Sequence, residues 1–400
     1  MTDRVKGVRD FTGKEAVLRQ ETIKKIRESY ELFGFEPIET PVLEYLSLFT
    51  EKSGPEIENQ MYSFEDKKGE KLALRPEHTV SRMRVVAEDR SIQKPLKAYG
   101  IGNVWRYEDV AKGRYREFLQ ADVDIYGSSS ISSDAEIIAC IDYALKRVGI
   151  SGYTIHINNR KVLQTLLDTL KISVENGYKV LKELDKVDKN GIDSVVKALS
   201  EFLEKEQTDG IKNFIEGNLP LKSDGNAEIR ELINYLDLYG IKNTVVDNAL
   251  VRGLDYYDGN IFEFIVDSSE YKGSIAGGGR YDKLSSKFGA TIPVVGCAIG
   301  FERVMEILKN RITDDFAGSY CVINIDNSDK AIEVAMRLRN KGQITDLLLD
   351  AASLSKGLDY CNSKRIRYAV IVGNKDLANG EVTIRDLKEK KDIKMKIQEI

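Results

Sequence analysis

Apolar residues recur along this chain at two spacings, and the changes between them divide its 400 residues into segments. In residues 13–33 and 133–147 a spacing of three to four residues predicts amphipathic helices. Residues 104–107 and 117–126 are rich in β-prone side chains, and the charged segment between them contains a glycine. This pattern predicts a strand, a loop and a returning strand.

Proline and glycine positions refine the elements of the first 90 residues. Residues 34–44 form an extended run with two prolines, which excludes the centre of a sheet and predicts an edge or interface strand. Residues 61–66 and 71–75 predict a hairpin around a Lys-Gly turn, and a helix is predicted over 80–88.

The segment 250–282 combines aromatic, apolar and glycine residues. Two β-prone runs flank Asp258-Gly259, which predicts a hairpin with Arg252 inside its first strand. A guanidinium in an apolar strand is expensive to bury unless an anion meets it. The run Gly277–Gly279 weakens a strand unless something approaches its backbone closely. Together these features predict the floor of a small-molecule pocket, although either half alone would suit a solvated edge hairpin.

Residues 160–245 differ from their surroundings, because long Leu-, Lys- and Glu-rich helical patterns replace the strand signals. An all-helical block between β-rich segments predicts an inserted subdomain, and the alternating strands and helices of the tail predict a small α/β domain. The predicted fold is therefore α+β, with a core at 1–159 and 246–316, a helical insertion at 160–245 and a further domain at 317–400.

Composition limits the class of protein. Hydrophobic residues make up 42% and charged residues 31% of the chain, as expected for a globular protein without extended disorder. The net charge is −4, but residues 317–400 carry 15 basic and 12 acidic side chains, so that the tail has a charge of +3 and the remainder −7. The total argues weakly against a nucleic-acid binder, although a local basic patch would serve equally well.

Four widely scattered cysteines without a Cys-x-x-Cys pair indicate free thiols in a reducing compartment, so we expect a cytoplasmic protein. Two histidines offer few ligands for a metal centre. We find no apolar leader and no run of 18 apolar residues, and therefore expect no membrane association.

Candidate phosphate-binding residues lie near the ends of the predicted strands. Arg106, Arg114 and Arg116 suit phosphate oxygens, because a planar guanidinium offers paired donors. Phe118, which follows these arginines in the chain, can stack on a base. Arg303 lies in the first turn of a helix predicted over 301–308, where an anion would offset its repulsion from the helix dipole. The alternative for Arg303 is an ordinary surface arginine.

Carboxylates and amides form a second group of candidates. The strand period of two places three polar residues of 117–126 on one face, namely Gln120, Asp122 and Asp124. Such a face can be solvated, or it can belong to a site. Glu77 and Thr79 are first-turn residues favoured by the helix dipole, or the Glu77 carboxylate at the end of a strand takes the ammonium group of a substrate amino acid.

These motifs resemble the three signatures of class II aminoacyl-tRNA synthetases. The helix and proline-bearing strand of 13–44 resemble the first signature, and the arginine-rich strands and loop of 104–118 resemble the second. The strand that leads into the helix of Arg303 resembles the third signature, and all three occur in the family's order.

The specificity motifs resemble those of one family within this class. Residues 250–257 and 277–282 resemble the two histidine-specific signatures of histidyl-tRNA synthetases. Residues 317–400 resemble, more loosely, the anticodon-binding domain that the histidyl, glycyl, prolyl and threonyl enzymes share. On this resemblance the chain is identified as a histidyl-tRNA synthetase of archaeal or bacterial length.

The resemblance implies a fold and a reaction. The fold would be an antiparallel sheet flanked by helices, with a helical insertion and a C-terminal α/β anticodon-binding domain, assembled as a homodimer. L-histidine would react with ATP to give histidyl-adenylate and pyrophosphate, and tRNA(His) would then receive the histidine at its 3′ end. Mg²⁺ would accompany ATP, and no resident metal site is expected.

The resemblance also assigns roles to individual residues. The α-phosphate would be clamped by the catalytic arginines Arg106 and Arg252. The other ATP contacts would come from Arg114, Arg303 and, at the adenine, Phe118. The α-ammonium group of histidine would be held by Glu77, Thr79 and Gln120. Asp124 would contact the imidazole directly, through water or through Tyr257. Tyr281 and the glycines around Gly278 would line the rest of the histidine pocket.

Two other classes of protein would share part of this pattern. The regulatory paralogue of ATP phosphoribosyltransferase, a non-catalytic histidine sensor, shares this core but typically lacks the anticodon domain and erodes the ATP-binding arginines. A stand-alone RNA-sensing module would not need those arginines either. Since a shared core does not decide function, the synthetase is favoured by the intact set Arg106, Arg114, Arg252 and Arg303.

Overall fold

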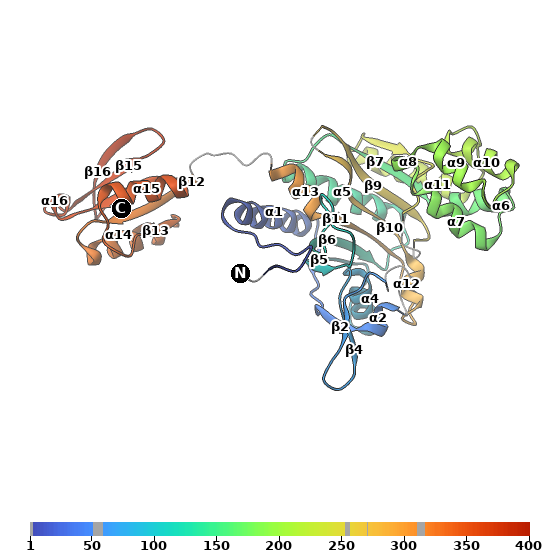
Figure 1. The fold of residues 1–400 in the computed structure, drawn as a ribbon, viewed down its shortest axis with the longest axis horizontal. Coiled ribbons are helices and arrows are strands. Elements are labelled where there is room, and N and C mark those ends of the chain that lie inside the picture. The colour runs from blue at the N-terminus through green and yellow to red at the C-terminus, as the bar shows by residue number, and fades with distance from the viewer. Residues whose placement is uncertain (1–2, 51–58, 253–256, 270, 310–316) are drawn as a thin grey trace. The chain divides into compact units, whose positions relative to one another are not determined.

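The computed structural model describes residues 3–50, 59–252, 257–269, 271–309 and 317–400. It separates into two compact units, Met1–Arg311 and Ile312–Ile400 (Figure 1). Each unit has its own large sheet and its own hydrophobic core.

The centre of the larger unit is an eight-stranded sheet. Its inner strands pair antiparallel, while the edge strands β1 and β8 pair in parallel with their neighbours. The strand order is β1 (Glu36–Pro37), β5 (Leu96–Trp105), β6 (Glu117–Tyr126), β11 (Val294–Gly300), β10 (Lys272–Arg280), β9 (Asn260–Asp267), β7 (Tyr153–Asn159) and β8 (Thr244–Val246). The edge position predicted for the proline-bearing run is confirmed by β1.

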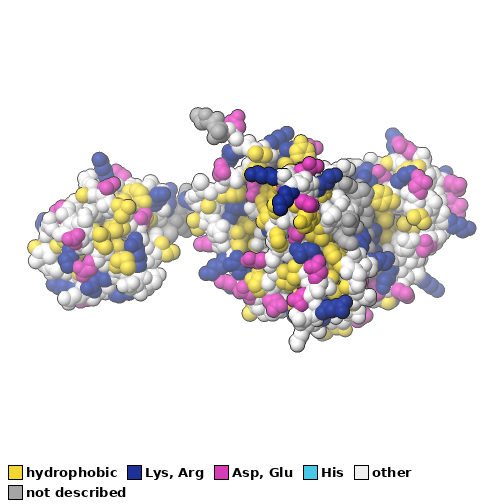
Figure 2. Space-filling model, turned by 90° about the horizontal axis from the view of Figure 1, so that it is seen from below, with side chains coloured by type: hydrophobic (Ala, Val, Ile, Leu, Met, Phe, Trp, Pro, Cys, Tyr) yellow, Lys and Arg dark blue, Asp and Glu magenta, His cyan; other side chains and the backbone are white. Residues whose placement is uncertain are grey.

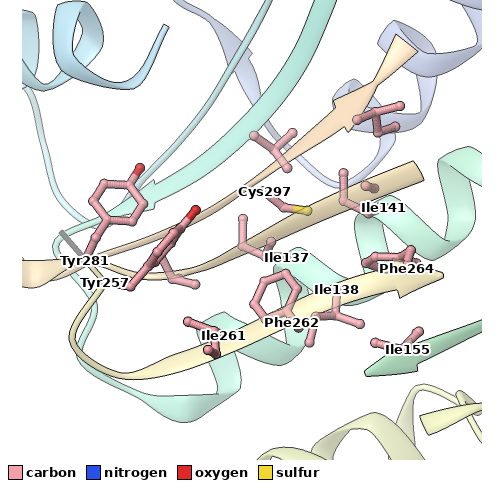
Figure 3. Close-up of a cluster of buried hydrophobic side chains, with 14 of the residues drawn as sticks. Ile137, Ile138, Ile141, Ile155, Tyr257, Ile261, Phe262, Phe264, Tyr281 and Cys297 are labelled. Atoms are coloured by element: carbon pink, nitrogen blue, oxygen red, sulfur yellow. The ribbon is translucent and has the colours of Figure 1, made fainter. Parts of the chain in front are cut away.

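Helix α5 (Ile131–Arg147) packs against β6, β10 and β11 and against α1 (Gly13–Leu32). The buried isoleucines on one side of α5 meet aromatic residues of β9, among them Phe262 and Phe264 (Figure 3). Because successive residues of a strand point to opposite faces, the other face of the sheet is left for the side chains described below.

A block of helices follows β7 in the chain and lies beside that end of the sheet (Figure 1). It contains α6 (Arg160–Thr169), α7 (Val174–Leu184), α8 (Val187–Asn190), α9 (Ile192–Leu199), α10 (Lys205–Ile215) and α11 (Asp224–Leu238). Helix α11 contacts α5, β7 and β9, which attaches the block to the sheet.

Shorter elements surround the sheet. A three-stranded sheet has the order β2 (Leu43–Tyr45), β4 (Lys71–Leu74) and β3 (Ser63–Glu65), so the predicted hairpin of β3 and β4 is confirmed. The helices of this part are α2 (Leu46–Thr50), α4 (Thr79–Glu88), α12 (Asp282–Ser286) and α13 (Phe301–Leu308).

The smaller unit has a five-stranded mixed sheet between helices. The strand order is β13 (Thr345–Leu347), β12 (Ala317–Asn324), β14 (Ile366–Val372), β15 (Glu381–Asp386) and β16 (Lys391–Lys396). Its helices are α14 (Ser328–Asn340), α15 (Leu354–Lys364) and α16 (Asn374–Leu377). Alternate residues of β12 face opposite sides of the sheet. Val322 therefore packs with α14, whereas Cys321 and Ile323 pack with α15.

The predicted α+β class is confirmed, but the hairpin predicted around Asp258-Gly259 is wrong. Both edges of β9 are already occupied, one by β10 and the other by β7. The run before Asp258 therefore has no edge to pair with, and Leu250–Arg252 and Tyr257 lie outside any strand, while residues 253–256 fall outside the described part. The hairpin of this region is the antiparallel pair β9 and β10.

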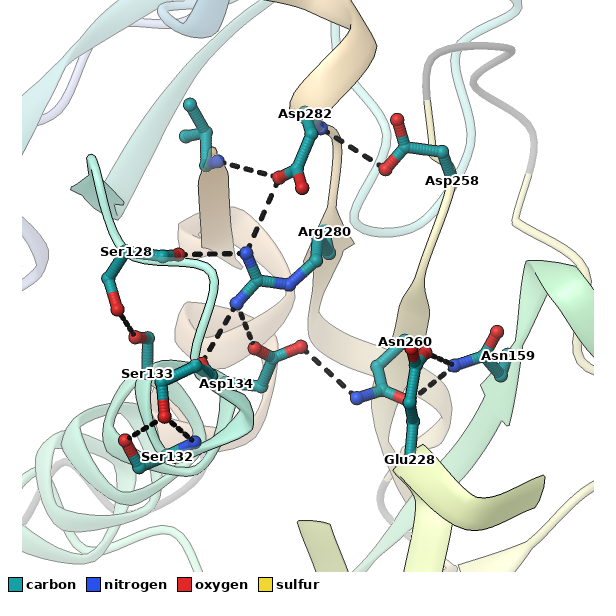
Figure 4. A network of polar contacts seen from close by, with 12 residues as sticks. Ser128, Ser132, Ser133, Asp134, Asn159, Glu228, Asp258, Asn260, Arg280 and Asp282 are labelled. Carbon is teal, nitrogen blue, oxygen red and sulfur yellow. Dashed lines mark hydrogen bonds and ion pairs between the residues drawn. The ribbon is translucent and has the colours of Figure 1, made fainter. Parts of the chain in front are cut away.

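A buried polar network fixes the end of β10 (Figure 4). Arg280 forms an ion pair with Asp134 of α5 and donates from Nη1 to the carbonyl oxygen of Ser128 at 2.9 Å. Asn260 of β9 donates to the second oxygen of Asp134 at 3.2 Å, and Asn159 of β7 donates to Asn260 at 2.8 Å. The network therefore joins three strands to α5.

Replacing Arg280 should destabilise the larger unit. Arg280→Met leaves the Asp134 carboxylate buried and unpaired, and loss of one partner of a buried pair costs about 3–5 kcal/mol. The free energy of unfolding can be followed in urea through Trp105, the single tryptophan of the chain, which lies in β5.

Two variants serve as controls for this prediction. Arg280→Met with Asp134→Asn should recover most of the lost stability, because no buried charge remains. Lys272→Met breaks an exposed ion pair with Asp267 in the same hairpin and should cost less than about 1 kcal/mol. Equal effects of Arg280→Met and Lys272→Met would contradict the structural role of the network.

Candidate active site

A cavity of about 640 Å³ lies over the middle of the eight-stranded sheet. Its floor is formed by β10 and β11, its walls by the loop between β5 and β6 and by the start of α13. The predicted site residues that line it are Arg106, Arg114, Phe118, Gln120, Arg252 and Arg303. The remaining ones, Glu77, Thr79, Asp124, Tyr257, Tyr281 and Gly278, are not among its lining residues.

Two arginines of this cavity are held by backbone carbonyl groups. Arg106 donates from Nε to the carbonyl oxygen of Pro76 at 2.9 Å, and its guanidinium carbon lies 5.4 Å from the centre of the Phe118 ring. Arg303 donates from Nη1 to the carbonyl oxygen of Ser274 at 2.7 Å. Among the described residues neither guanidinium is hydrogen-bonded to a carboxylate, so both can still bind a polyanionic ligand.

Arg252 reaches the cavity from an irregular segment. The prediction that it lies inside a strand is therefore wrong. Its backbone φ of 58° is left-handed, which costs a residue with a side chain roughly 1–3 kcal/mol. Nη1 donates to Oε1 of Glu263 at 2.9 Å, and the guanidinium carbon lies 5.6 Å from the Tyr257 ring centre. Glu263 is thus an anion that meets Arg252 among the described residues.

The glycines of β10 leave room for these side chains. A Cβ atom on Gly277 would overlap Nη1 of Arg252, and one on Gly278 would overlap the carbonyl oxygen of Gly296 in β11. The close approach expected from the glycine run is therefore present on both sides of β10: a guanidinium meets Gly277, and neighbouring backbone meets Gly278.

The residues predicted for the α-ammonium group have different surroundings. Glu77 is buried, and its carboxylate accepts hydrogen bonds from the backbone N–H groups of Thr79 and, at 3.0 Å, Val80. It therefore caps the start of α4, and burial raises its pKa while these hydrogen bonds oppose the shift. Gln120 lines the cavity, and its Oε1 has no hydrogen-bond partner among the described residues.

Asp124, Tyr257 and Tyr281 lie buried near the cavity. Tyr281 donates a hydrogen bond from its hydroxyl group to Asp124. The two tyrosine rings meet edge to face, with centroids 6.2 Å apart, and Figure 3 shows their hydroxyl groups pointing to the same side. Asp122 and Asp124 are 3% and 2% exposed, so the solvated alternative for this face of β6 is wrong.

None of the carboxylates that line the cavity, Glu108, Asp109, Glu263 and Glu302, was predicted as a site residue. Glu263 could have been found as a charged residue in the middle of the otherwise apolar run Ile261–Val266 of β9. Glu302 accepts from Nη1 of Arg19 at 2.8 Å and pairs with Arg9. Burial alone would raise the pKa of Glu302, but Arg19 and Arg9 hold it below its ordinary value. These partners are more than 280 residues away in the chain, and no local signal indicates the contact.

The described residues bring together no group of three or more His, Cys, Asp or Glu side chains that could hold a metal ion. Among those same residues, none of the helices combines the length and the apolar character needed to cross a lipid bilayer.

Comparison with known proteins agrees with this geometry. Residues 7–304 match the family model of histidyl-tRNA synthetase, and residues 320–400 match that of an anticodon binding domain. The histidine--tRNA ligase of Pyrococcus abyssi is 38% identical over 423 aligned positions, which cover 100% of this chain and 98% of that protein.

Solved structures share the fold. The crystal structure of histidyl-tRNA synthetase from Nostoc sp. PCC 7120 has a TM-score of 0.85 and 26% identity, over 99% of this chain and 98% of that one. A protein from Bacillus halodurans described as an ATP phosphoribosyltransferase regulatory subunit/histidyl-tRNA synthetase has a TM-score of 0.79 at 24% identity, over 93% and 98% of the two chains. At that identity the second likeness concerns the fold alone.

The regulatory-subunit alternative is not favoured, because the relatives that match along the whole chain are ligases and an anticodon binding domain is present. The arginines that such a sensor would not need line one cavity. Both family models and the full-length relatives lead to the same conclusion: this chain belongs to the histidyl-tRNA synthetases, aminoacyl-tRNA synthetases that join histidine to tRNA.

Proposed function

We propose that the cavity binds ATP and L-histidine side by side and carries out both steps of histidine transfer. In the first step a carboxylate oxygen of histidine attacks the α-phosphorus of ATP, and pyrophosphate leaves with the bonding electrons. In the second step the terminal ribose hydroxyl of tRNA(His) attacks the carbonyl carbon of histidyl-adenylate, and AMP leaves. The observation that carries the proposal is that Arg106, Arg114, Arg252, Arg303 and Phe118 line one cavity.

Phosphoryl chemistry of this kind requires positioning and charge neutralisation more than a protein base. We assign Arg106 and Arg252 to the α-phosphate, where negative charge increases as the new bond forms. Arg114 and Arg303 would hold the β- and γ-phosphates, and Phe118 would stack on the adenine. Arg252 would have to exchange the Glu263 carboxylate for a phosphate oxygen, which links its placement to the arrival of ATP.

Magnesium would enter the site as part of the ATP substrate. Glu108, Asp109 and Glu263 line the cavity, and carboxylate oxygens are ligands that Mg²⁺ accepts together with phosphates and water. Glu302 is less suited, because Arg9 and Arg19 already neutralise it.

Histidine would bind beside the phosphates, with its ammonium group near the start of α4. The unpartnered Oε1 of Gln120 can accept an N–H from the ammonium group, and Glu77 and Thr79 would complete its ligands. The imidazole would lie over the Gly278 region toward Tyr257, Tyr281 and Asp124. A phenol and a carboxylate can satisfy the two ring nitrogens, here with Asp124 acting through Tyr281 or a water molecule.

A site that hydrogen-bonds its substrate in this way rejects apolar analogues strongly, because they leave buried polar groups unpaired. We therefore propose that selection of histidine needs no separate editing site.

We also propose a division of the chain into a core (1–159 and 246–316), a helical insertion (160–245) and an anticodon-binding domain (317–400). The anticodon-binding domain would contact tRNA(His).

We infer further that the enzyme is a homodimer. Tyr45, Leu72 and Phe64 are opposite one another on adjacent strands of the three-stranded sheet, so their side chains share a face, and Tyr45 and Phe64 are 59% and 47% exposed. Figure 2 shows apolar side chains gathered between charged ones on one face of the larger unit. Apolar patches of this kind mark interaction surfaces.

We also propose that the enzyme is cytoplasmic. The four cysteines are free thiols, which fits a reducing compartment.

The activation step can be tested by ATP–pyrophosphate exchange with each of the twenty amino acids in turn. We expect exchange with histidine alone. Arg252→Ala should lower the exchange rate by about 10²–10³-fold, the usual effect of removing one donor from a developing negative charge. Arg147→Ala removes an exposed arginine of α5 that pairs with Glu28 and should leave exchange unchanged. Lack of exchange with every amino acid would contradict the proposed function.

The oligomeric state can be measured by light scattering after size-exclusion chromatography. The wild-type protein should have twice the chain mass of 45.1 kDa. Phe64→Asp should shift the measured mass toward that of a single chain, because it places a charge beside the apolar side chains of Tyr45 and Leu72. Val174→Asp, at a 96% exposed position of α7, is the matched control and should stay dimeric. A monomeric wild-type protein would contradict the assignment.

A further inference from the structure

Arg82 is a fully buried cation beneath the proposed histidine pocket. It lies in α4 and is 1% exposed. Its Nη2 is 2.5 Å from Oδ2 of Asp124 and 3.4 Å from Oδ2 of Asp122, both in β6. A buried guanidinium is costly without an anion, and it is among the largest fully buried side chains of the described chain.

The surrounding backbone is shaped to admit this cluster. A Cβ atom on Gly100 in β5 would overlap Nη1 of Arg82, and one on Gly296 in β11 would overlap Oδ1 of Asp124. Glycines thus stand at the two points where a side chain would push the ion pair apart, as expected if the position of these charged groups matters.

The contacts of Arg82 continue to the histidine pocket. Asp124 accepts the hydrogen bond from the Tyr281 hydroxyl group, and α12, which follows Tyr281 directly, contacts α4. Thr79 and Arg82 are three residues apart on α4 and therefore share a face of that helix. One short helix thus carries both a proposed ligand of the ammonium group and the cation that touches Asp124.

The two carboxylates are not equivalent. Burial raises the pKa of Asp122 to about 7 and also raises the pKa of Asp124, and Arg82 opposes both shifts. The shorter contact, 2.5 Å against 3.4 Å, joins Arg82 to Asp124. A carboxylate accepts hydrogen bonds when ionised and donates one when protonated, so Arg82 favours the accepting form of Asp124.

We propose that Arg82 is a positioning residue for histidine recognition: its guanidinium fixes the Asp124 carboxylate, which in turn orients the Tyr281 hydroxyl group toward the imidazole. This inference rests on the proposed function of the cavity. It assigns to Arg82 an effect on histidine binding, whereas the ATP-binding arginines reach the cavity from other elements.

A purely structural role would make a different prediction. In that case Arg82 would serve to neutralise buried negative charge between α4 and β6, and any change that removes the excess charge would restore the site. The two roles therefore separate in a variant that lacks both the guanidinium and one carboxylate.

The test uses the full-length protein and histidine-dependent ATP–pyrophosphate exchange, with KM measured separately for histidine and for ATP. The variants are Arg82→Met, Asp122→Asn and the double variant, each checked for cooperative thermal unfolding. Arg82→Met and the double variant should raise KM for histidine by about 10- to 100-fold, the effect of losing a hydrogen bond to a charged group. KM for ATP should stay near the wild-type value, and Asp122→Asn alone should change neither constant.

The outcomes separate this inference from the proposed function. If Arg82→Met does not fold, the double variant decides alone, because it restores the net charge that the cluster carries in the wild-type protein when both carboxylates are ionised. Restoration of the wild-type KM for histidine in the double variant would overturn the positioning role, as would an equal rise of both KM values or a large effect of Asp122→Asn alone. Absence of exchange in the wild-type protein would instead overturn the proposed function and, with it, the role of Arg82.

Discussion

The site depends on bare backbone at the centre of the eight-stranded sheet. Where β10 pairs with β11, Gly277 is opposite Ala298, and Gly279 is opposite Gly296. Side chains from neighbouring segments occupy the space that is left: Arg252 fills the position of a Cβ on Gly277, and Asp124 fills that of one on Gly296. Close packing in protein interiors leaves no second place for these groups. The glycines therefore decide where the charges of the site stand.

Most buried arginines of the larger unit have a carboxylate partner. Arg280 pairs with Asp134, Arg82 with Asp124 and Arg19 with Glu302, while buried Arg75 donates to the carbonyl oxygens of Asn103 and Thr40. Such pairs leave little charge for a ligand. In the cavity, Arg106 and Arg303 are held by carbonyl oxygens, which orient a guanidinium without neutralising it. Positioned cations that no described carboxylate binds directly are what a triphosphate requires.

Arg252 is intermediate between these two groups. It lines the cavity, yet it pairs with Glu263, whose side chain is partly exposed. An ion pair that remains in contact with solvent is weaker than a buried one, so a phosphate group can compete for the guanidinium. The left-handed backbone of Arg252 shows that its position is constrained by the surrounding structure, and strain of this kind concentrates at functional sites.

Much of the fold could be predicted from local patterns. The strand β6, the helix α13 and the edge position of β1 followed from periodicity and proline, whereas the strand predicted over 104–107 covers only the last two residues of β5. Arg106, Arg114, Phe118 and Arg303 could be named because each motif is contiguous in the chain. The hairpin at Asp258-Gly259 failed because β7 occupies the edge of β9, a contact across about a hundred residues. Glu302 and Arg82 were missed for the same reason, since their partners come from distant elements.

The central claim, that the missing side chain of Gly277 sets the position of Arg252, can be tested with one measurement. Gly277→Ala displaces the flexible end of Arg252 rather than backbone, so the fold should survive. The histidine-dependent exchange rate should fall by about 10²-fold, as for a catalytic group displaced by an ångström. Gly318→Ala, where the added methyl group meets open space, should exchange at the wild-type rate. Equal rates for the two folded variants would contradict the account.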